Sequence, residues 1–415
     1  MDKSICFVGL GYIGLPTAVA LANSGANVVG FDINEKLIEK IKSGNLNLKE
    51  PNLRKELKVA LDSGNLKVSS KISSHDVYVI AVPTPFLEDH SCDYSYIDSA
   101  IRSISKELKG GELIILESTS APGTTRRIAN LVSHLRPDLD KEVNNRSDST
   151  EVEFAYCPER ILPGNAINEL RSNDRVIGGL TERAAIRAKK FYKSFCHGEL
   201  LLTDAETAEM VKLVENSYRD VNLAFANEIS MLSDNFDVDV RELIQLANHH
   251  PRVNILQPSA GVGGHCIAVD PWFLVSSNPA ESTLIATARK VNDRKPFWII
   301  DKIESSGFIE SPRLALLGIT FKPNIDDLRE SPALRICEEL ARENPNTLFE
   351  IVEPNLSELP SSLSKFPNVE QIDLGVVVDS KDPLVVLVAH DEFKALRELK
   401  EGKIPILDFT GILHG

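Results

Sequence analysis

Several features are scarce in this sequence of 415 residues, and each scarcity argues against a class of protein. The six cysteines are scattered without a Cys-x-x-Cys pair, which disfavours a disulfide framework and suits a reducing compartment. No apolar run approaches the roughly 18 residues that a membrane span requires. The apolar stretch from Ile5 to Ala22 is interrupted by glycines and Pro16, which disfavours a signal peptide. We therefore expect a cytoplasmic protein.

Basic residues are also fewer than acidic ones. Lys and Arg number 46 against 60 Asp and Glu, which leaves a formal net charge of -14. A field of that sign repels nucleic acid and anionic lipid, so we expect neither a nucleic-acid nor a membrane partner. An anionic small ligand would need cations concentrated locally. The hydrophobic fraction of 42% is ordinary for globular proteins, and the length predicts two or three domains.

Short apolar segments alternate with helical segments at both ends of the chain, which is typical of parallel, doubly wound sheets. A long helix without internal glycine or proline is expected from Thr203 to about Asp234, and helical segments continue to about Ser306. The sequence therefore predicts an α/β protein in three parts: a sheet domain (1–202), a central helical region (203–306) and a second sheet domain (307–415). The expected strands are Ser4–Val8, Asn27–Phe31, Val77–Val82, Leu113–Glu117, Phe154–Tyr156, Val176–Gly179, Leu314–Gly318, Phe349–Val352, Leu384–Val388 and Ile404–Asp408.

A glycine-rich turn follows the first expected strand. Gly9, Gly11 and Gly14 have the G-x-G-x-x-G spacing, a helical segment follows, and Asp32 ends the second strand. In such a turn the first glycine permits the bend, the second lets the backbone approach a pyrophosphate, and the third lets the helix pack on the strand. Asp32 would accept hydrogen bonds from ribose hydroxyls, and no arginine directly follows it, which favours NAD over NADP. We expect an NAD-binding, Rossmann-like domain here and a second Rossmann-like domain at the C-terminus.

A second glycine-rich stretch, 261–264, precedes Cys266, and Asp270 lies four residues further on. Amides at the start of a helix, together with a neighbouring cation, favour the nucleophilic thiolate form of a cysteine. A buried and inert Cys266 is the alternative, and both readings stay open. Zinc is disfavoured because neither H-x-x-x-H nor C-x-x-C spacing occurs. The residues considered as zinc ligands are His249, His250, His265, Cys266 and Asp270.

Polar residues recur on one face of the expected long helix. Lys212, Asn216 and Arg219 stand at i, i+4 and i+7, and the positions opposite them are apolar. A lysine held against a cleft can transfer protons. The alternative interpretation is a polar stripe that faces solvent.

Taken in order, these motifs resemble the UDP-glucose/UDP-mannosamine dehydrogenase family over nearly the whole chain. Segments 12–17, 250–256 and 265–273 look most like the members that oxidise UDP-N-acetyl-D-mannosamine. The resemblance implies two successive hydride transfers to NAD that convert the carbon-6 alcohol of the sugar to a carboxylate for surface polysaccharide synthesis. UDP-N-acetylglucosamine and UDP-glucose are the alternative substrates. The motifs that carry the resemblance are Gly9–Gly14, Ser118-Thr119-Ser120, Cys157-Pro158-Glu159-Arg160, Lys212 with Asn216, Gly261–Asp270, and Phe321-Lys322-Pro323 with Arg329-Glu330-Ser331.

The resemblance also implies a role for each catalytic residue. Cys266 would hold the aldehyde as a thiohemiacetal and then as a thioester. Lys212 and a water near Asp270 would manage the first proton, and Asn216 would hydrogen-bond the developing oxyanion. Glu159 and a second water, held near Thr119, would carry out hydrolysis of the thioester.

Binding residues follow from the same resemblance. Arg252 would reach in from a partner subunit, so a homodimer or a dimer-based oligomer is expected. No metal ion is expected in the site. One departure is visible, because Pro122 stands one place later than in the family's Ser-Thr-Ser-Pro run. The cofactor-binding residues are Gly9, Gly11, Tyr12, Ile13, Gly14, Asp32, Thr84 and Thr119. The substrate-binding residues are Arg160, Ile161, Lys212, Asn216, Arg219, His250, Arg252, Gly263, Lys322 and Arg329.

Two other classes of function remain open at this point. A single-step dehydrogenase of the 3-hydroxyacid type also joins an NAD domain to a helical one, and it would not need Cys266. A protein that binds a nucleotide sugar without catalysis is the other.

Overall fold

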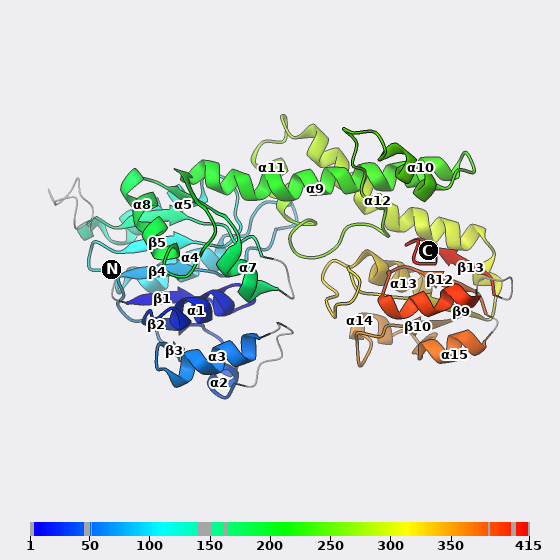
Figure 1. Cartoon of the computed structure of the whole chain (residues 1–415), viewed down its shortest axis with the longest axis horizontal. Coiled ribbons are helices and arrows are strands. Elements are labelled where there is room, and N and C mark those ends of the chain that lie inside the picture. The colour runs from blue at the N-terminus through cyan, green and yellow to red at the C-terminus, as the bar shows by residue number, and fades with distance from the viewer. Residues whose placement is uncertain are drawn as a thin grey trace. The chain divides into compact units, whose positions relative to one another are not determined.

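The computed structural model describes residues 4–44, 50, 52–139, 151–161, 165–380, 382–399 and 404–413. The chain divides into two compact units, Met1–Glu215 and Asn216–Gly415. The helix α9 (Ala205–Asp234), drawn in green in Figure 1, contains the boundary between them. Across the described ranges, no helix combines the length and the apolar character that crossing a membrane demands.

One sheet organises the first unit. Within its described residues eight strands are hydrogen-bonded in the order β3-β2-β1-β4-β5-β6-β7-β8. The order reverses between β1 and β4, as expected for a Rossmann-like domain. The strands are β1 (Ile5–Val8), β2 (Val28–Phe31), β3 (Leu66–Ser69), β4 (Val77–Ile80), β5 (Leu113–Leu116), β6 (Glu153–Tyr156), β7 (Arg175–Gly179) and β8 (Leu200–Asp204).

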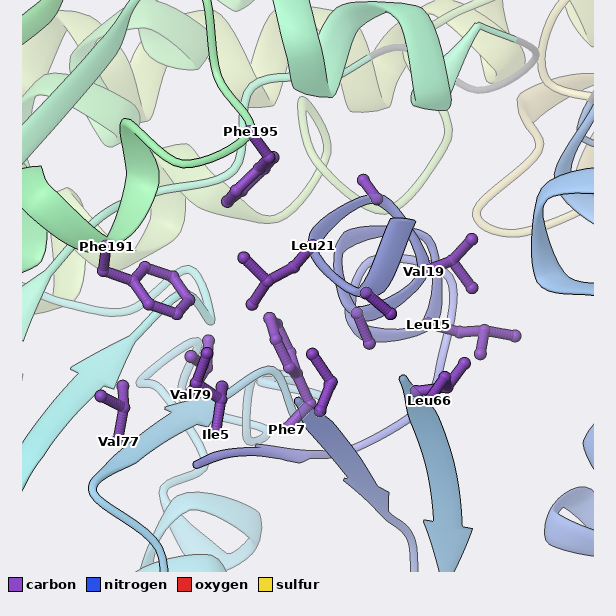
Figure 2. Close-up of a cluster of buried hydrophobic side chains, with 14 of the residues drawn as sticks. Ile5, Phe7, Leu15, Val19, Leu21, Leu66, Val77, Val79, Phe191 and Phe195 are labelled. Carbon is purple, nitrogen blue, oxygen red and sulfur yellow. The ribbon is translucent and has the colours of Figure 1, made fainter. Parts of the chain in front are cut away.

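Helices cover both faces of this sheet, which is why its central strands are apolar without alternation. Figure 2 shows one of the two resulting cores, where Phe7 of β1 and Val79 of β4 face the helix α1. Leu21 of α1 and Phe191 of α8 close the same core. The helices of the unit are α1 (Gly14–Asn23), α2 (Glu35–Lys42), α3 (Leu53–Asp62), α4 (Ser95–Ser105), α5 (Thr124–Leu135), α7 (Ala166–Ser172) and α8 (Glu182–Tyr192), with a 3₁₀ turn at Pro137–Leu139.

One strand direction differs from the expectation of an all-parallel sheet. β7 pairs with β6 antiparallel, whereas the other neighbouring pairs are parallel. The seven-residue helix α7 between them is about 10 Å long, too short to carry the chain back across the sheet. Arg175, which begins β7, therefore lies at the carboxyl end of β6.

A second parallel sheet organises the other unit, with strand order β11-β10-β9-β12-β13 in its described part. Three strands were not predicted: β3 and β8 in the first unit, and the edge strand β11, where Glu370 and Gln371 are exposed and leave little apolar signal. Thr203 and Asp204, expected to begin the long helix, instead end β8. The strands are β9 (Arg313–Leu317), β10 (Leu348–Val352), β11 (Val369–Gln371), β12 (Leu384–Val386) and β13 (Ile406–Asp408). The helices are α10 (Val240–Ala247), α11 (Asp270–Ser277), α12 (Thr283–Ser305), α13 (Pro332–Glu343), α14 (Ser361–Ser364) and α15 (Leu374–Asp379), with 3₁₀ segments at Phe308–Glu310 and Asp391–Leu399.

Helix α9 buries polar side chains and exposes apolar ones, the reverse of an ordinary amphipathic helix. Lys212 and Asn216 are buried, so the interpretation as a solvent-facing polar stripe is wrong. Arg219, seven residues after Lys212 on the same helix, is exposed. Of the apolar positions opposite, Val214 and Tyr218 are exposed by 49% and 70%. The buried face of α9 must therefore be paired by polar partners.

One such partner is Arg289 of α12, whose Nη1 lies 2.6 Å from Oδ1 of Asp220 on α9. Both side chains are almost fully buried, and Asn292 donates a second hydrogen bond to the same carboxylate at 2.8 Å. Removing one member of a buried ion pair leaves an uncompensated charge in a medium that solvates it poorly.

We predict that Arg289→Ala lowers the free energy of unfolding by about 3–5 kcal/mol, because Asp220 loses its cation. Denaturant titration followed by circular dichroism measures the change. The control is Arg342→Ala, which removes an exposed ion pair with Glu339 and should leave the unfolding midpoint nearly unchanged. Equal effects of the two substitutions would contradict the prediction.

Candidate active site

The glycine-rich turn after β1 is shaped by two close contacts and one open position. Gly9 has a φ of +97°, and a Cβ there would lie 2.5 Å from the carbonyl oxygen of Ala81. A Cβ on Gly14 would overlap the carbonyl oxygen of Gly9. A Cβ on Gly11 would meet nothing within 4 Å. Since α1 begins at Gly14, this open backbone stands at a helix N-terminus, and it fits the pyrophosphate of a dinucleotide.

Asp32, directly after β2, is half-buried and braces that turn. One carboxylate oxygen accepts from the amide of Leu10 at 2.9 Å, and the other accepts from the amide of Asn34 at 2.8 Å. Each oxygen retains a further lone pair for a ribose hydroxyl. The predicted cofactor contact is therefore combined with a structural role that the motif alone did not indicate.

The loops after β4 and β5 are joined by a residue that received no role from the sequence. Ser118 Oγ donates to the carbonyl oxygen of Val82 at 2.8 Å and lies 2.9 Å from its amide nitrogen. Thr84 is buried and Thr119 is half-buried on these loops. Ser118 could have been singled out only from its place in the Ser-Thr-Ser run.

The remaining predicted cofactor residues lie in the glycine turn itself. The hydroxyl of Tyr12 donates to the carboxylate of Glu50. Ile13, the residue before α1, uses its carbonyl oxygen to accept from Thr17 Oγ1 at 2.9 Å. The predicted cofactor residues therefore lie on loops at the carboxyl ends of β1, β2, β4 and β5.

Glu159 follows β6 and is 5% exposed. The ammonium group of Lys212 donates a hydrogen bond to the backbone carbonyl oxygen of Glu159 at 2.7 Å, and both residues belong to the first unit. One oxygen of the Glu159 carboxylate accepts from the amide of Ile161. Glu159 and Arg175 both line a small pocket, so the antiparallel β7 brings a guanidinium to the predicted catalytic acid.

Burial is the largest influence on Glu159, and it raises the pKa of the carboxyl to about 7. The cations of Lys212 and Arg175 oppose this shift, and the buried carboxyl of Glu117 adds to it. A carboxyl whose pKa lies near neutrality can both accept and return a proton under physiological conditions.

Arg160, a predicted substrate residue, is engaged within the first unit. Its Nη2 lies 2.7 Å from Oε1 of Glu215, and its Nη1 donates to the carbonyl oxygen of Asp174 at 3.2 Å. Ile161, the other predicted substrate residue in this stretch, is half-buried beside it.

In the second unit, the glycines before Cys266 serve packing. A Cβ on Gly263 would lie 2.5 Å from the carbonyl oxygen of Glu330, and one on Gly264 would lie 2.8 Å from the ring of Phe321. The Gly264 amide also donates to the carbonyl oxygen of Arg329 at 2.9 Å. The loop 261–266, here called the thiol loop, therefore packs against the segment between β9 and α13. That segment carries Lys322 and Arg329, which are expected to bind substrate.

Cys266 is exposed, so the interpretation as a buried, inert cysteine is wrong. It does not begin a helix as expected: a turn intervenes, and α11 begins at Asp270. The Asp270 amide donates to the Cys266 carbonyl oxygen at 2.9 Å, which places the two residues one turn apart. The Asp270 carboxylate is buried and accepts from the side-chain amide of Asn216 at 2.5 Å.

The remaining predicted substrate residues of the second unit are exposed. Arg329 forms an ion pair with Asp327 at 2.6 Å and interacts electrostatically with Cys266. A cation at that position favours the thiolate form of a cysteine. Lys322 is exposed on the same segment, whereas His250 and Arg252 are exposed on the segment after α10.

Comparison with known proteins finds one family along the chain. Residues 3–196 match the NAD binding domain of the UDP-glucose/GDP-mannose dehydrogenase family, 206–294 its central domain and 315–414 its UDP binding domain. The chain is 46% identical to the UDP-N-acetyl-D-mannosamine dehydrogenase of Escherichia coli, covering 99% of each. It is 45% identical to an NDP-N-acetyl-D-galactosaminuronic acid dehydrogenase of Ralstonia nicotianae, covering 99% of this chain and 96% of that protein. The solved UDP-D-ManNAc dehydrogenase of Pyrococcus horikoshii has a TM-score of 0.84 and 37% identity, over 99% of this chain and 96% of that one.

The open position in the glycine turn gives a test of the dinucleotide site. We predict that Gly11→Ala leaves the unfolding midpoint nearly unchanged but weakens NAD binding by about tenfold or more, because the new methyl group occupies the approach to the backbone. Gly14→Ala should instead destabilise the fold, since its methyl group overlaps Gly9. Thermal unfolding and NAD calorimetry separate the two effects. Unchanged NAD affinity in Gly11→Ala would contradict the assignment.

The buried Glu159 predicts a pH-dependent stability. The folded chain holds a proton on Glu159 up to about pH 7, whereas the ordinary pKa is 4.5. Folding therefore takes up a proton between these values, and the free energy of unfolding should fall by roughly 2–3 kcal/mol as pH rises through them. Glu159→Gln cannot ionise and should lack this contribution. Denaturant titrations of both proteins at about pH 5 and about pH 8 measure the difference, and parallel pH dependences would refute the prediction.

Proposed function

The chain belongs to the UDP-glucose/GDP-mannose dehydrogenase family, and from this we propose that it oxidises carbon-6 of UDP-N-acetyl-D-mannosamine to the carboxylate with NAD. The observation that carries the proposal is an exposed Cys266 beside the Arg329 guanidinium, on a loop that follows a glycine-rich stretch. A reaction that stops at the aldehyde would need no such thiol. The product is the uronic acid, a building block for surface polysaccharide.

In the first oxidation the sugar alcohol loses a proton and a hydride. Bound NAD supplies the hydride acceptor for each oxidation. We assign the proton to Lys212 and to a water held by Asp270. The Asn216 amide, already oriented by its hydrogen bond to Asp270, is assigned to the developing oxyanion.

In the second oxidation the Cys266 thiolate adds to the aldehyde carbon and its oxygen takes up a proton, giving a thiohemiacetal. In this adduct the hydrogen that remains on carbon-6 lies on a tetrahedral carbon that bears a hydroxyl group. Its departure as a second hydride, together with loss of the hydroxyl proton, leaves a thioester on Cys266. Glu159 is assigned as the base that removes a proton from the hydrolytic water, with Thr119 holding that water. Hydrolysis breaks the carbon–sulfur bond and returns the thiol. A carboxyl with a pKa of about 7 suits the role of Glu159.

We assign binding to the residues that the resemblance indicated. Gly9, Gly11, Gly14 and Asp32 support NAD through the open turn, and Tyr12, Ile13, Thr84 and Thr119 complete that set. The other residues assigned to the UDP-sugar are Arg160, Ile161, Arg219, His250, Arg252, Gly263, Lys322 and Arg329, among them four arginines and a lysine. Such a set would concentrate positive charge locally in a chain of net charge -14.

The proposed partner is a second copy of the chain. Tyr218, Phe225 and Leu232 recur every seven residues on α9 and are exposed by 70%, 52% and 46%. An apolar stripe with this spacing is typical of a helix that packs against another helix. The exposed Arg252 would then be available to a neighbouring subunit. We also propose the three-part division at 202/203 and 306/307 and a cytoplasmic location.

A second candidate substrate has specific support. The Ralstonia nicotianae relative is named for a galactosaminuronic acid and is nearly as similar to this chain as the Escherichia coli one. A nucleotide-linked N-acetylgalactosamine is therefore the second candidate, and the glucose-derived UDP-sugars remain comparators. The choice between sugar epimers depends on side-chain placement within about one ångström.

We predict that the purified protein yields two NADH per UDP-N-acetyl-D-mannosamine consumed and that Cys266→Ser forms no uronate, because the thioester cannot form. Absorbance of NADH, with separation of the sugar nucleotides, measures both quantities. Parallel assays with the galactosamine, glucosamine and glucose nucleotides test the sugar preference.

The matched control is Cys337→Ala, which removes a thiol buried in α13 and should retain the stoichiometry. A yield of one NADH with accumulation of the aldehyde would refute the four-electron reaction. Higher kcat/KM for another nucleotide sugar would overturn only the choice of substrate.

A further inference from the structure

Glu353 and His390 form a buried acid–imidazole pair in the second unit, and neither residue was predicted to belong to the site. Glu353 follows β10, and His390 lies beyond the end of β12. Both side chains are 0% exposed, and Nε2 of His390 is 3.1 Å from Oε2 of Glu353. A pair of this kind, fully removed from water, requires an explanation in terms of what it holds in place.

The neighbours of His390 determine which nitrogen of its ring accepts hydrogen bonds. The backbone amide of Asn324 and the side-chain amide of Asn355 each lie 3.0 Å from Nδ1. A backbone amide can only donate, so Nδ1 accepts and the ring proton is on Nε2. The ring therefore accepts from Asn324 at Nδ1, while its Nε2 faces the Glu353 carboxylate. His390 thus connects β10 to the far end of the turn that follows β9.

Glu353 holds the near end of the same turn. Its Oε2 accepts from the Ile319 amide at 2.8 Å, and its Oε1 accepts from the Asn355 amide at 3.0 Å. Burial pushes the pKa of Glu353 upward, but the bonds from His390 and Ile319 outweigh it, and the pKa lies below its ordinary value. The group is therefore a carboxylate at neutral pH, and it fixes the start of the turn as His390 fixes its end.

Lys322 lies between these two anchors. Its carbonyl oxygen accepts from Thr320 Oγ1 at 3.0 Å, while its side chain is exposed. A Cβ on Gly318 would lie 2.5 Å from Cβ of Val388, so the base of the turn presses against the segment after β12. Strand order reverses between β9 and β12, and open parallel sheets bind ligands at that point.

We propose that Glu353 and His390 are positioning residues that hold the 318–324 turn, and with it Lys322, in the conformation that binds the uridine diphosphate of the substrate. The inference rests on the proposed function, because it assigns the pair to affinity for that substrate. Neither side chain touches the reacting carbon. Their loss should therefore act on substrate binding and leave the chemical step intact.

The test makes two separate variants. His390→Phe keeps a ring but loses the polar contacts with Glu353, Asn324 and Asn355, and Glu353→Gln removes the carboxylate charge. We expect KM for the UDP-sugar to rise about tenfold or more, the range given by losing a charge-assisted hydrogen bond, with kcat and KM for NAD within about twofold. Calorimetry with UDP alone should show the same loss of affinity. This second readout does not depend on activity.

The control is Asn368→Ala, which removes buried hydrogen bonds to Ala341 and Thr347 near the start of β11. It should lower stability without changing KM or UDP affinity. Unchanged UDP affinity in His390→Phe, a kcat loss without a KM change, or an equal KM rise in Asn368→Ala would overturn the inference. If the wild type oxidises no UDP-sugar, the proposed function fails, and UDP calorimetry still decides the role of the pair.

Discussion

Backbone segments approach one another in this protein at distances that only glycine permits, and both predicted ligand sites depend on that approach. In the first unit, Gly14 lets α1 start against the carbonyl oxygen of Gly9, and the backbone at Gly11 stays open in front of that helix start. In the second unit, Gly263 and Gly264 let the thiol loop lie on the segment between β9 and α13. Any side chain at these positions would separate the binding loop from the element that supports it.

Burial of polar groups is the second theme. Helix α9 exposes Tyr218 and buries Lys212 and Asn216, so its polar face must find partners in the interior. The partners differ along the helix: a backbone carbonyl oxygen for Lys212 and a carboxylate for Asn216. Because Lys212 and Asn216 are each held by a specific bond, the helix keeps these two side chains in fixed orientations without exposing them to bulk water. The cost of such burial is visible in the raised pKa of Glu159.

Much of this arrangement could be predicted from the sequence, and the exceptions have physical reasons. Continuous apolar runs located strands such as β1 and β4, and the glycine turn with Asp32 located the dinucleotide site. The edge strand β11 lacks an apolar run, and the direction of β7 cannot be predicted from its composition. Glu353 and His390 escaped notice because they are 37 residues apart and meet only through the order of the strands. Local patterns carry local structure, whereas pairing between distant loops depends on topology.

The distribution of the cysteines has one more consequence. All six lie in the described ranges, five are buried, and Cys266 alone is exposed. Oxidants such as peroxide attack accessible thiols first, so their effect would concentrate on that single sulfur. The thiol to which the proposed function assigns the covalent step is thus also the thiol that oxidants in the surroundings can reach.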